Sequence, residues 1–128
     1  VDTRAMSRAQ GLDDSAAYAQ SKLALTMWSR SLGQAQASTG PSVIAVNPGS
    51  FLGSKMVKQA YGIAGEDLRI GADILCRAAL SEAFANVSGQ YFDNDAGDFA
   101  QPHRDALDAA KCQAVIDAID GVLAKVLP

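Results

Sequence analysis

The sequence has two cysteines and a single histidine, which leaves little material for metal or disulfide chemistry. Neither Cys76 nor Cys112 has a second cysteine or a histidine at the spacing of metal ligands. We therefore predict no metal site, and we expect both thiols to be small buried side chains in a reducing compartment. A disulfide or redox pair is the alternative.

Clusters of basic residues and long apolar runs are also missing. The net charge is −3, and the absence of any Lys/Arg run argues against a nucleic-acid binder that works through a basic face. No stretch approaches the ~20 apolar residues of a transmembrane helix, and no signal-peptide pattern opens the chain. We expect a cytoplasmic protein with no nucleic-acid and no membrane partner.

Aromatic residues make up only 6% of the chain, whereas hydrophobic residues make up 48% and charged residues 20%. This is the composition of a globular protein and not of a disordered one. A chain of 128 residues is long enough for one domain with a core and too short for two. It begins with Val1, so we expect that this end is not a natural translation start.

Helix and strand patterns alternate along the chain. Residues 16–37 are good helix formers, and either Asp14 or Ser15 could cap this long helix. The short apolar run 43–46 then predicts a strand that is buried on both faces, as in a parallel sheet. Further along, the pattern predicts a short helix over 55–60, a helix over 66–83, a strand at 89–93, a polar loop over 93–105, and a last helix capped by Asp108. These elements imply a layered α/β sheet, but two strands make a poor sheet, so we expect part of a larger fold.

Tyr18 and Lys22 are the residues most suited to chemistry. Residues four apart on a helix lie on one face, so a phenol and an ammonium group would point into the same space. A free tyrosine has a pKa near 10, and a nearby Lys⁺ lowers such a pKa because it stabilises the phenolate. The pair could then take a proton from an alcohol or donate one to a forming alkoxide. Spacing alone is weak evidence, because an exposed pair near a helix start would look the same.

A turn after the predicted strand adds context to this pair. Pro48 and Gly49 follow the strand directly, at the carboxyl end where open α/β sheets bind ligands. Proline restricts the turn, and glycine lets the backbone approach a ligand closely. A plain strand-ending turn is the alternative.

Together these segments resemble the short-chain dehydrogenases/reductases. Tyr18-Ala-Gln-Ser-Lys22 resembles the Tyr-x-x-x-Lys helix of that family, and Val46-Asn-Pro-Gly-Ser50 resembles its Pro-Gly turn. Gly89-Gln-Tyr-Phe92 resembles its last strand, and the resemblance spans roughly residues 13–95. It implies a doubly wound parallel Rossmann-type sheet in three α/β/α layers. Residues 1–128 would then be the C-terminal half of one oxidoreductase domain whose dinucleotide-binding half is absent.

The resemblance also implies a role for each matching residue. Tyr18 would be the catalytic acid/base, and Lys22 would lower its pKa and hydrogen-bond the nicotinamide ribose. Pro48, Gly49 and Ser50 would border the nicotinamide. The implied cofactor is NAD or NADP, bound by the intact parent protein and not expected in this chain alone. The implied substrate is a small-molecule carbonyl/alcohol pair.

Two features of the family's pattern are displaced or missing. The threonine that usually follows the Pro-Gly turn and contacts the cofactor has no equivalent in this sequence. Its nearest match is Ser54, which is one step displaced. The alternative role for Ser54 is to cap the helix over 55–60. The catalytic serine, commonly about 13 residues before the tyrosine, would fall at Ala5. Members that resemble retinol dehydrogenases place it further upstream, so we expect it before Val1, with Ser7 as the fallback.

No glycine-rich dinucleotide turn follows a strand, so the pyrophosphate and adenine sites are expected to be missing as well. Asp93, Asp95 and Asp98 are spaced partly like a calcium loop. They lack its sixth-position glycine and twelfth-position glutamate, so a solvated loop is the prediction.

The helix over 16–37 also offers an interface. Its apolar residues Met27, Trp28 and Leu32 are expected to pack in a core or between subunits, and the family resemblance implies a homodimer or homotetramer through this helix. Two functions remain as alternatives to the oxidoreductase. One is a nucleotide-sugar epimerase or dehydratase that uses the same pair, and the other is a non-catalytic scaffold or regulatory remnant of the same fold.

Overall fold

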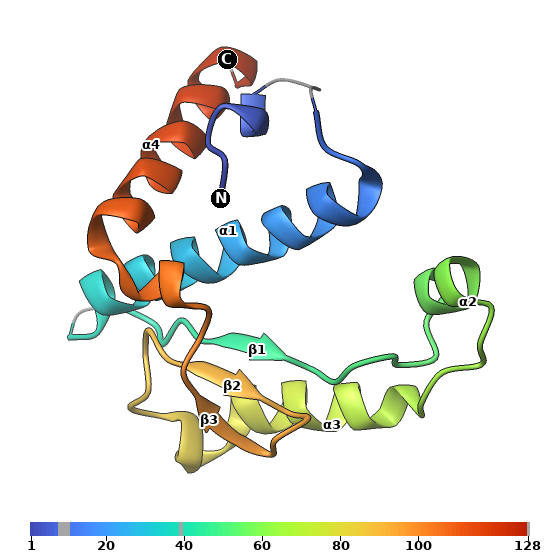
Figure 1. The fold of residues 1–128 in the computed structure, drawn as a ribbon. Coiled ribbons are helices and arrows are strands. Elements are labelled where there is room, and N and C mark those ends of the chain that lie inside the picture. Colours follow the sequence, from blue (N-terminus) through green and yellow to red (C-terminus); the bar gives the residue numbers. More distant parts are fainter. Residues whose placement is uncertain (8–10, 39, 128) are drawn as a thin grey trace.

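The structure is a computed structural model that describes residues 1–7, 11–38 and 40–127 (Figure 1). The described residues form an α/β fold whose main elements, in chain order, are α1 (Asp14–Gln36), β1 (Ala45–Asn47), α2 (Lys55–Tyr61), α3 (Leu68–Leu80), β2 (Tyr91–Asp93), β3 (Asp98–Ala100) and α4 (Ala109–Val126). The predicted order of helices and strands is confirmed for all of these except β3.

The sheet is small and mixed, with the strand order β1-β2-β3. β1 pairs with β2 in parallel, with Val46 beside Phe92, and β2 pairs with β3 in antiparallel, with Phe92 beside Phe99. The prediction of a polar loop over 93–105 is therefore wrong for β3. A three-residue strand whose one large apolar side chain is Phe99 has no sequence pattern of its own, and it forms because β2 offers it a free edge.

One core cluster lies between α1 and α4. Met27 on α1 and Val115 on α4 are each 1% exposed, and Cys112 packs beside them. The prediction that Met27 packs in a core is confirmed. Cys112 is buried as expected, whereas Cys76 is exposed, and both thiols are free, so the disulfide alternative is wrong.

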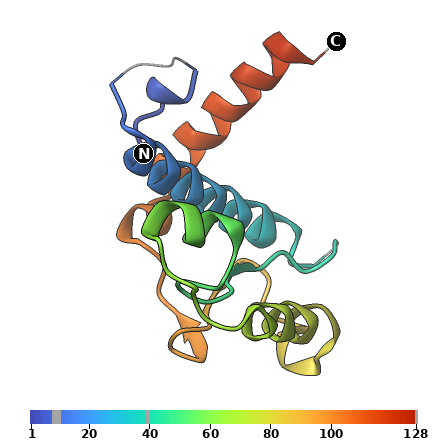
Figure 2. The same cartoon turned by 90° about the vertical axis from the view of Figure 1, so that its right-hand side faces the viewer.

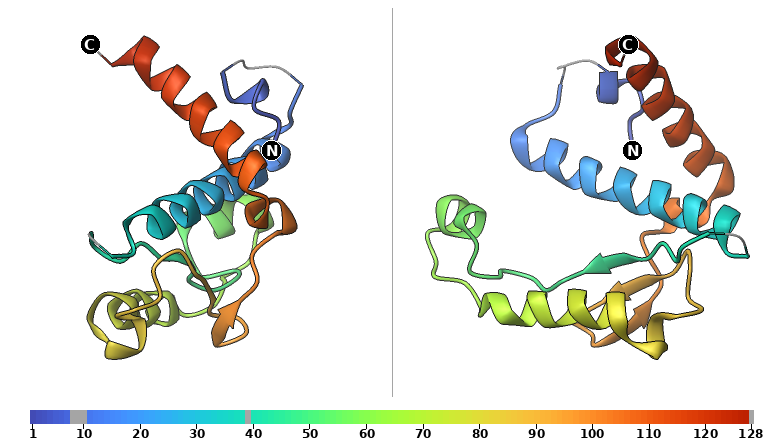
Figure 3. Two further views of the ribbon diagram at one scale, coloured as in Figure 1. Left: turned by 90° about the vertical axis from the view of Figure 1, so that its left-hand side faces the viewer. Right: turned by 180° about the vertical axis from the view of Figure 1, so that it is seen from behind.

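A second core cluster joins α3 to the sheet. Ile74 of α3 packs with Phe92 of β2 and with Phe84, which lies in a 3₁₀ helix at Glu82–Phe84. Phe84, Phe92 and Phe99 make three ring contacts with centroids 5.1–5.2 Å apart, in the tilted and edge-on arrangements that aromatic rings favour. The views in Figures 2 and 3 show α1 on one side of the sheet and α3 on the other.

The helix ends follow local capping chemistry. Asp13, and not the predicted Asp14 or Ser15, caps α1, since its carboxylate accepts from the Ala16 N–H at 2.8 Å. Asp108 caps α4 as predicted, with bonds of 3.0 Å from the N–H groups of residues 110 and 111. The helix expected to reach residue 83 ends instead at Leu80, where the extended backbone of Ser81 breaks it.

The strand predicted over 43–46 lies at Ala45–Asn47 and is half-buried along its length, so the expectation of burial on both faces is wrong. The reason is that β1 has one neighbour: β2 covers one edge, and no strand within the described ranges covers the other. Within the same ranges, no helix is long and apolar enough to cross a membrane.

Candidate functional site

Tyr18 and Lys22 lie together on α1, as the spacing predicts. The Lys22 Nζ is 5.5 Å from the centre of the Tyr18 ring, and both side chains are exposed. Both line a cavity of about 460 Å³ between α1 and β1, called the first cavity here, which Asn47 and Pro48 close from the strand side. The structure therefore brings the pair to the carboxyl end of β1.

A second cavity of similar volume opens on the other side of Tyr18. Its walls come from the turn after β1, including Gly49 and Ser50, and from α2, and Tyr18, Asn47 and Pro48 are common to both cavities. Gly49 has a φ of +130°, a conformation that side chains rarely adopt, so glycine is required in this turn. Tyr18 thus stands between a space that Lys22 lines and a space that α2 lines.

The two predicted serines have internal partners. Ser54 caps α2, since its Oγ accepts from the Val57 N–H at 3.2 Å, so the alternative role for this residue is confirmed. Ser50 donates its hydroxyl to Asp95 at 2.5 Å. Both serines line the second cavity and neither lines the first.

Asp95 has a role in the site that the sequence does not indicate, since the sequence predicts only a solvated loop there. It lies in the turn between β2 and β3, yet its carboxylate holds the loop after β1 through the Ser50 N–H at 2.9 Å, the Ser50 hydroxyl, and the Asn47 Nδ2 at 3.0 Å. These bonds to Ser50 and Asn47 lower the pKa of Asp95 from its ordinary value. The neighbouring Asn94 donates to the Pro48 carbonyl at 3.0 Å. Asn94 and Asp95, in the segment predicted as a polar loop over 93–105, therefore clamp the Pro-Gly turn.

Protonation of Asp95 is expected to release this clamp. Because its pKa is lowered in the folded chain, its contribution to stability is present above pH ~4 and is lost as the pH falls through the folded value. Asp95→Asn should act like acid at neutral pH, shifting the amide resonances of Ser50 and Asn47 and lowering stability by ~1 kcal/mol. The measurement is an NMR titration with urea unfolding. Asp120→Asn, on the exposed face of α4, is the control, and equal shifts in both variants would contradict the clamp.

Tyr91 is a second tyrosine that the sequence did not single out. It lies on β2 and lines the first cavity beside Lys22. Burial, followed by the negative charges of Asp93 and Asp95, raises the pKa of Tyr91 above its ordinary value. Its phenol therefore stays protonated at neutral pH and offers the cavity a hydrogen-bond donor without a charge.

Other predicted residues lie apart from these cavities. The Ser7 side chain lies outside the described residues, so its fallback role stays a prediction. The single histidine, His103, to which the sequence assigns no role, lies before a 3₁₀ helix (Arg104–Leu107), where its Nδ1 accepts from the Asp105 N–H at 3.2 Å. In the part of the chain that the structure describes, no group of three His, Cys, Asp or Glu side chains could hold a metal ion.

The arrangement places a phenol and an ammonium group around the first cavity, and the same phenol and a glycine turn around the second, at the carboxyl end of a parallel strand. Such a set can bind a polar ligand and exchange a proton with it. Comparison of the chain with family models, curated proteins and solved structures finds no match.

Proposed function

We propose that this chain forms the C-terminal half of an NAD(P)-dependent oxidoreductase of the short-chain dehydrogenase/reductase kind. The parent protein would transfer a hydride between the nicotinamide and a carbonyl/alcohol substrate. The observation that carries the proposal is the position of Tyr18 and Lys22, which line one cavity with Pro48 at the carboxyl end of β1.

In the proposed reaction Tyr18 is the proton donor and acceptor. During reduction its Oη donates a proton to the oxygen that becomes the alcohol, and during oxidation it takes that proton back. Lys22 stabilises the phenolate left behind, because its ammonium group lies on the same helix face. The bound nicotinamide supplies or accepts the hydride. Pro48 and Gly49 shape the wall of the site, and Asp95 holds that wall in place through Ser50.

The residues present fit one end of such a cofactor. Tyr18, Lys22 and the turn at Pro48 offer hydroxyl, ammonium and close backbone approach for a nicotinamide and its ribose. Ser54 is engaged in capping α2, so its part in cofactor binding is the weakest of the proposed roles. No glycine-rich turn joins a strand to a helix here to hold pyrophosphate. The remaining cofactor sites are therefore proposed to lie in the N-terminal half of the parent.

The free edge of β1 also supports the proposal that the parent domain has an N-terminal half in addition to this chain. Ala45 donates to the Gln90 carbonyl at 3.2 Å, and the Asn47 carbonyl accepts from Asn94 at 3.1 Å, so these two residues turn their backbone groups toward β2. Ile44 and Val46 therefore turn theirs toward the opposite edge. We propose that the Rossmann-type sheet of the parent, with its three α/β/α layers, continues at this edge.

Two measurements test the function. Calorimetry is expected to show one NAD or NADP site per parent chain and no stoichiometric binding of NADPH to the 128-residue chain. Incubation of the parent with deuterated cofactor and a panel of ketones and aldehydes is expected to place deuterium on the product's carbinol carbon. Tight cofactor binding with no net oxidation would favour the epimerase or dehydratase, and absence of cofactor binding would favour the non-catalytic scaffold.

The proposed parent is a homodimer or homotetramer through α1. Trp28 and Leu32 lie four residues apart on one face of this helix, and Trp28 is 38% exposed and lines neither cavity. An apolar stripe of this kind is the usual seam between two helices. The occupant we propose is α1 of a second copy of the chain.

Trp28→Glu is expected to shift this assembly toward the monomer, because it places a charge in the seam. Light scattering of the unmodified chain should give a mass above 13.3 kDa, and the variant should approach that value. Leu123→Glu is the matched control, since Leu123 is 42% exposed on α4. A monodisperse monomer for the unmodified chain, or equal effects of both variants, would contradict an interface through α1.

A further inference from the structure

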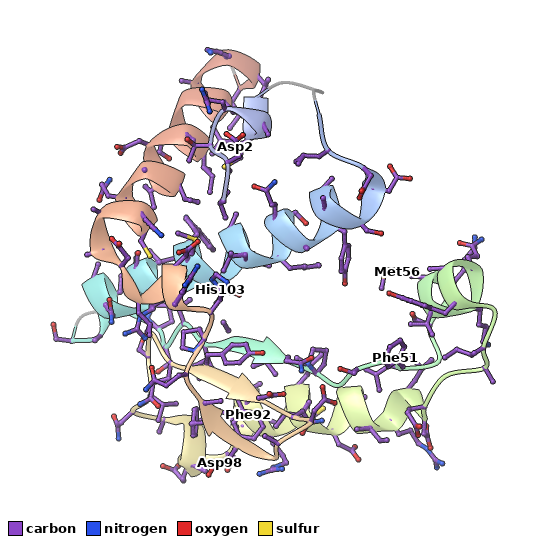
Figure 4. The ribbon with its side chains drawn as sticks, viewed as in Figure 1. Asp2, Phe51, Met56, Phe92, Asp98 and His103 are labelled. Atoms are coloured by element: carbon purple, nitrogen blue, oxygen red, sulfur yellow. The ribbon has the colours of Figure 1, made fainter. Side chains whose placement is uncertain are left out.

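The second cavity has one strongly apolar wall. Phe51 on the loop after β1, Met56 and Tyr61 on α2, and Leu68 at the start of α3 are each at least half exposed, and all four line this cavity. Figure 4 shows Phe51 and Met56 on the α2 side of the molecule, across from α1. A monomeric protein rarely leaves large apolar side chains gathered around a hollow unless they contact something apolar.

The backbone beneath this wall is held in an unusual conformation. Phe51 has a φ of +51°, which is rare for a bulky residue, and residues with strained backbones are often clustered at functional sites. The Phe51 carbonyl accepts from the Glu66 N–H at 2.8 Å, and the Gly53 N–H donates to the Glu66 carbonyl at 2.7 Å. These bonds join the two ends of the α2 segment. They hold the Phe51 ring edge-on to Tyr61, with centroids 5.3 Å apart.

Most of the polar side chains that line the second cavity already form hydrogen bonds within the chain. The side chains of Asn47 and Ser50 donate to Asp95, and the Ser54 hydroxyl caps α2. The hydroxyls of Tyr18 and Tyr61 remain, and among the described residues none offers a hydrogen-bond partner to either of them. The lining contains no Asp, Glu, Lys, Arg or His. A ligand here therefore meets two phenol hydroxyls, Tyr18 on α1 and Tyr61 on α2, and an uncharged apolar wall.

We infer that the substrate of this site is a neutral, mainly hydrocarbon ketone or alcohol. Its oxygen would lie at Tyr18, and its chain would lie against Phe51, Met56, Tyr61 and Leu68. An ionised substrate would bring a charge into a cavity whose lining includes no charged side chain, since Lys22 lines the first cavity and not this one, and this costs binding free energy. The inference rests on the proposed function, but it concerns binding and can be tested without hydride transfer.

The test is ligand-observed NMR on the 128-residue chain with 2-butanone, 2-hexanone and 2-octanone. Affinity is expected to rise about threefold for each added methylene, because each one removes apolar surface from water. Octanoate and octylammonium are expected to bind at least tenfold more weakly than 2-octanone. Affinity that is independent of chain length, or equal binding of the charged probes, would overturn the inference.

Substitutions of two leucines on α3 test where 2-octanone binds. Leu68 lines the cavity and is 54% exposed, whereas Leu75 is 53% exposed on the same helix and does not line it. Leu68→Ala is expected to weaken 2-octanone binding about fivefold, and Leu75→Ala to change it less than twofold. Equal losses in both variants would mean that the ketone binds elsewhere.

Met56→Lys is expected to increase the affinity for one probe, octanoate, and a variant that fails to fold could not show such an increase. It is expected to weaken 2-octanone and to strengthen octanoate, because the new ammonium group supplies the missing counter-charge. Unchanged octanoate binding would contradict the placement of the ligand. Chain-length-dependent binding without deuterium transfer in the parent would refute the oxidoreductase and leave this apolar site. Deuterium transfer that prefers charged substrates would refute the apolar site alone.

Discussion

Tyr18→Phe is expected to lower the kcat of the parent oxidoreductase by about 10²–10⁴-fold, the range by which general acid–base groups accelerate reactions. The substitution removes one oxygen and leaves the ring in place. The phenol is 48% exposed and, within the described ranges, no hydrogen-bond partner holds its hydroxyl, so thermal stability is expected to stay the same. Loss of turnover at constant stability would separate a chemical role from a packing role.

Steady-state kinetics measures kcat, and thermal unfolding of the same preparations measures stability. Lys22→Met is expected to lower kcat in the same assay by less, because the phenol remains but loses the nearby positive charge. Lys125→Met, in the last turn of α4, removes the same charge far from the cavities and is the control. Turnover by Tyr18→Phe within threefold of the parent would refute the assignment of Tyr18.

Gly33→Ala is expected to destabilise the folded chain by about 3 kcal/mol, the upper end of the usual range for overpacking. Gly33 lies in the second half of α1 and is buried against the segments that lead into β1 and β2. A Cβ at this position would lie 2.4 Å from the Gly89 nitrogen and 2.7 Å from the Val43 carbonyl oxygen. Both neighbours are backbone atoms, which cannot turn aside as a flexible side chain can.

The surrounding hydrogen bonds make this contact stiff. Ser88 donates its hydroxyl to the Gly33 carbonyl at 2.9 Å and accepts from the Val43 N–H at 3.1 Å. Arg30 donates to the Gly89 carbonyl at 3.1 Å. To admit a methyl group, α1 must move away from the sheet, and these bonds must lengthen or break. The same movement would displace Tyr18 and Lys22 from β1.

Gly121→Ala is the matched control, with an effect of opposite sign. Gly121 also lies inside a helix, α4, but a Cβ there meets no atom within 4 Å. Alanine favours a helix over glycine by about 1 kcal/mol, so this variant is expected to be more stable. Urea unfolding measures the free energy of unfolding of both variants. An unchanged value for Gly33→Ala would mean that α1 does not contact Gly89 and Val43 as closely as described.

Predictions that depend on neighbouring residues agree best with the structure. Asp108 and Ser54 cap α4 and α2, as their positions before helical runs indicate. A capping bond joins residues two or three positions apart, so the sequence contains both partners within one turn. The shared face of Tyr18 and Lys22 follows for the same reason, from the helical repeat of 3.6 residues.

Predictions that depend on distant residues were wrong or missing. Asp95 is 45 positions from Ser50, and nothing near Asp95 in the sequence indicates a bond between them. The sequence predicts a loop at β3, because the pairing of β3 with β2, and not its own composition, makes it a strand. Three-residue strands carry too short a pattern to specify their register.

The sequence by itself determined that α1 carries a phenol and an ammonium group on one face and that a glycine turn ends the strand after it. Both follow from helical periodicity and from the backbone conformations of individual residues. Only the tertiary structure decided that Asp95 holds this turn, that Gly33 contacts Gly89, and that Phe51 and Leu68 meet in one wall. These contacts join segments far apart in the chain, and only the packing of helices on a sheet brings such segments together.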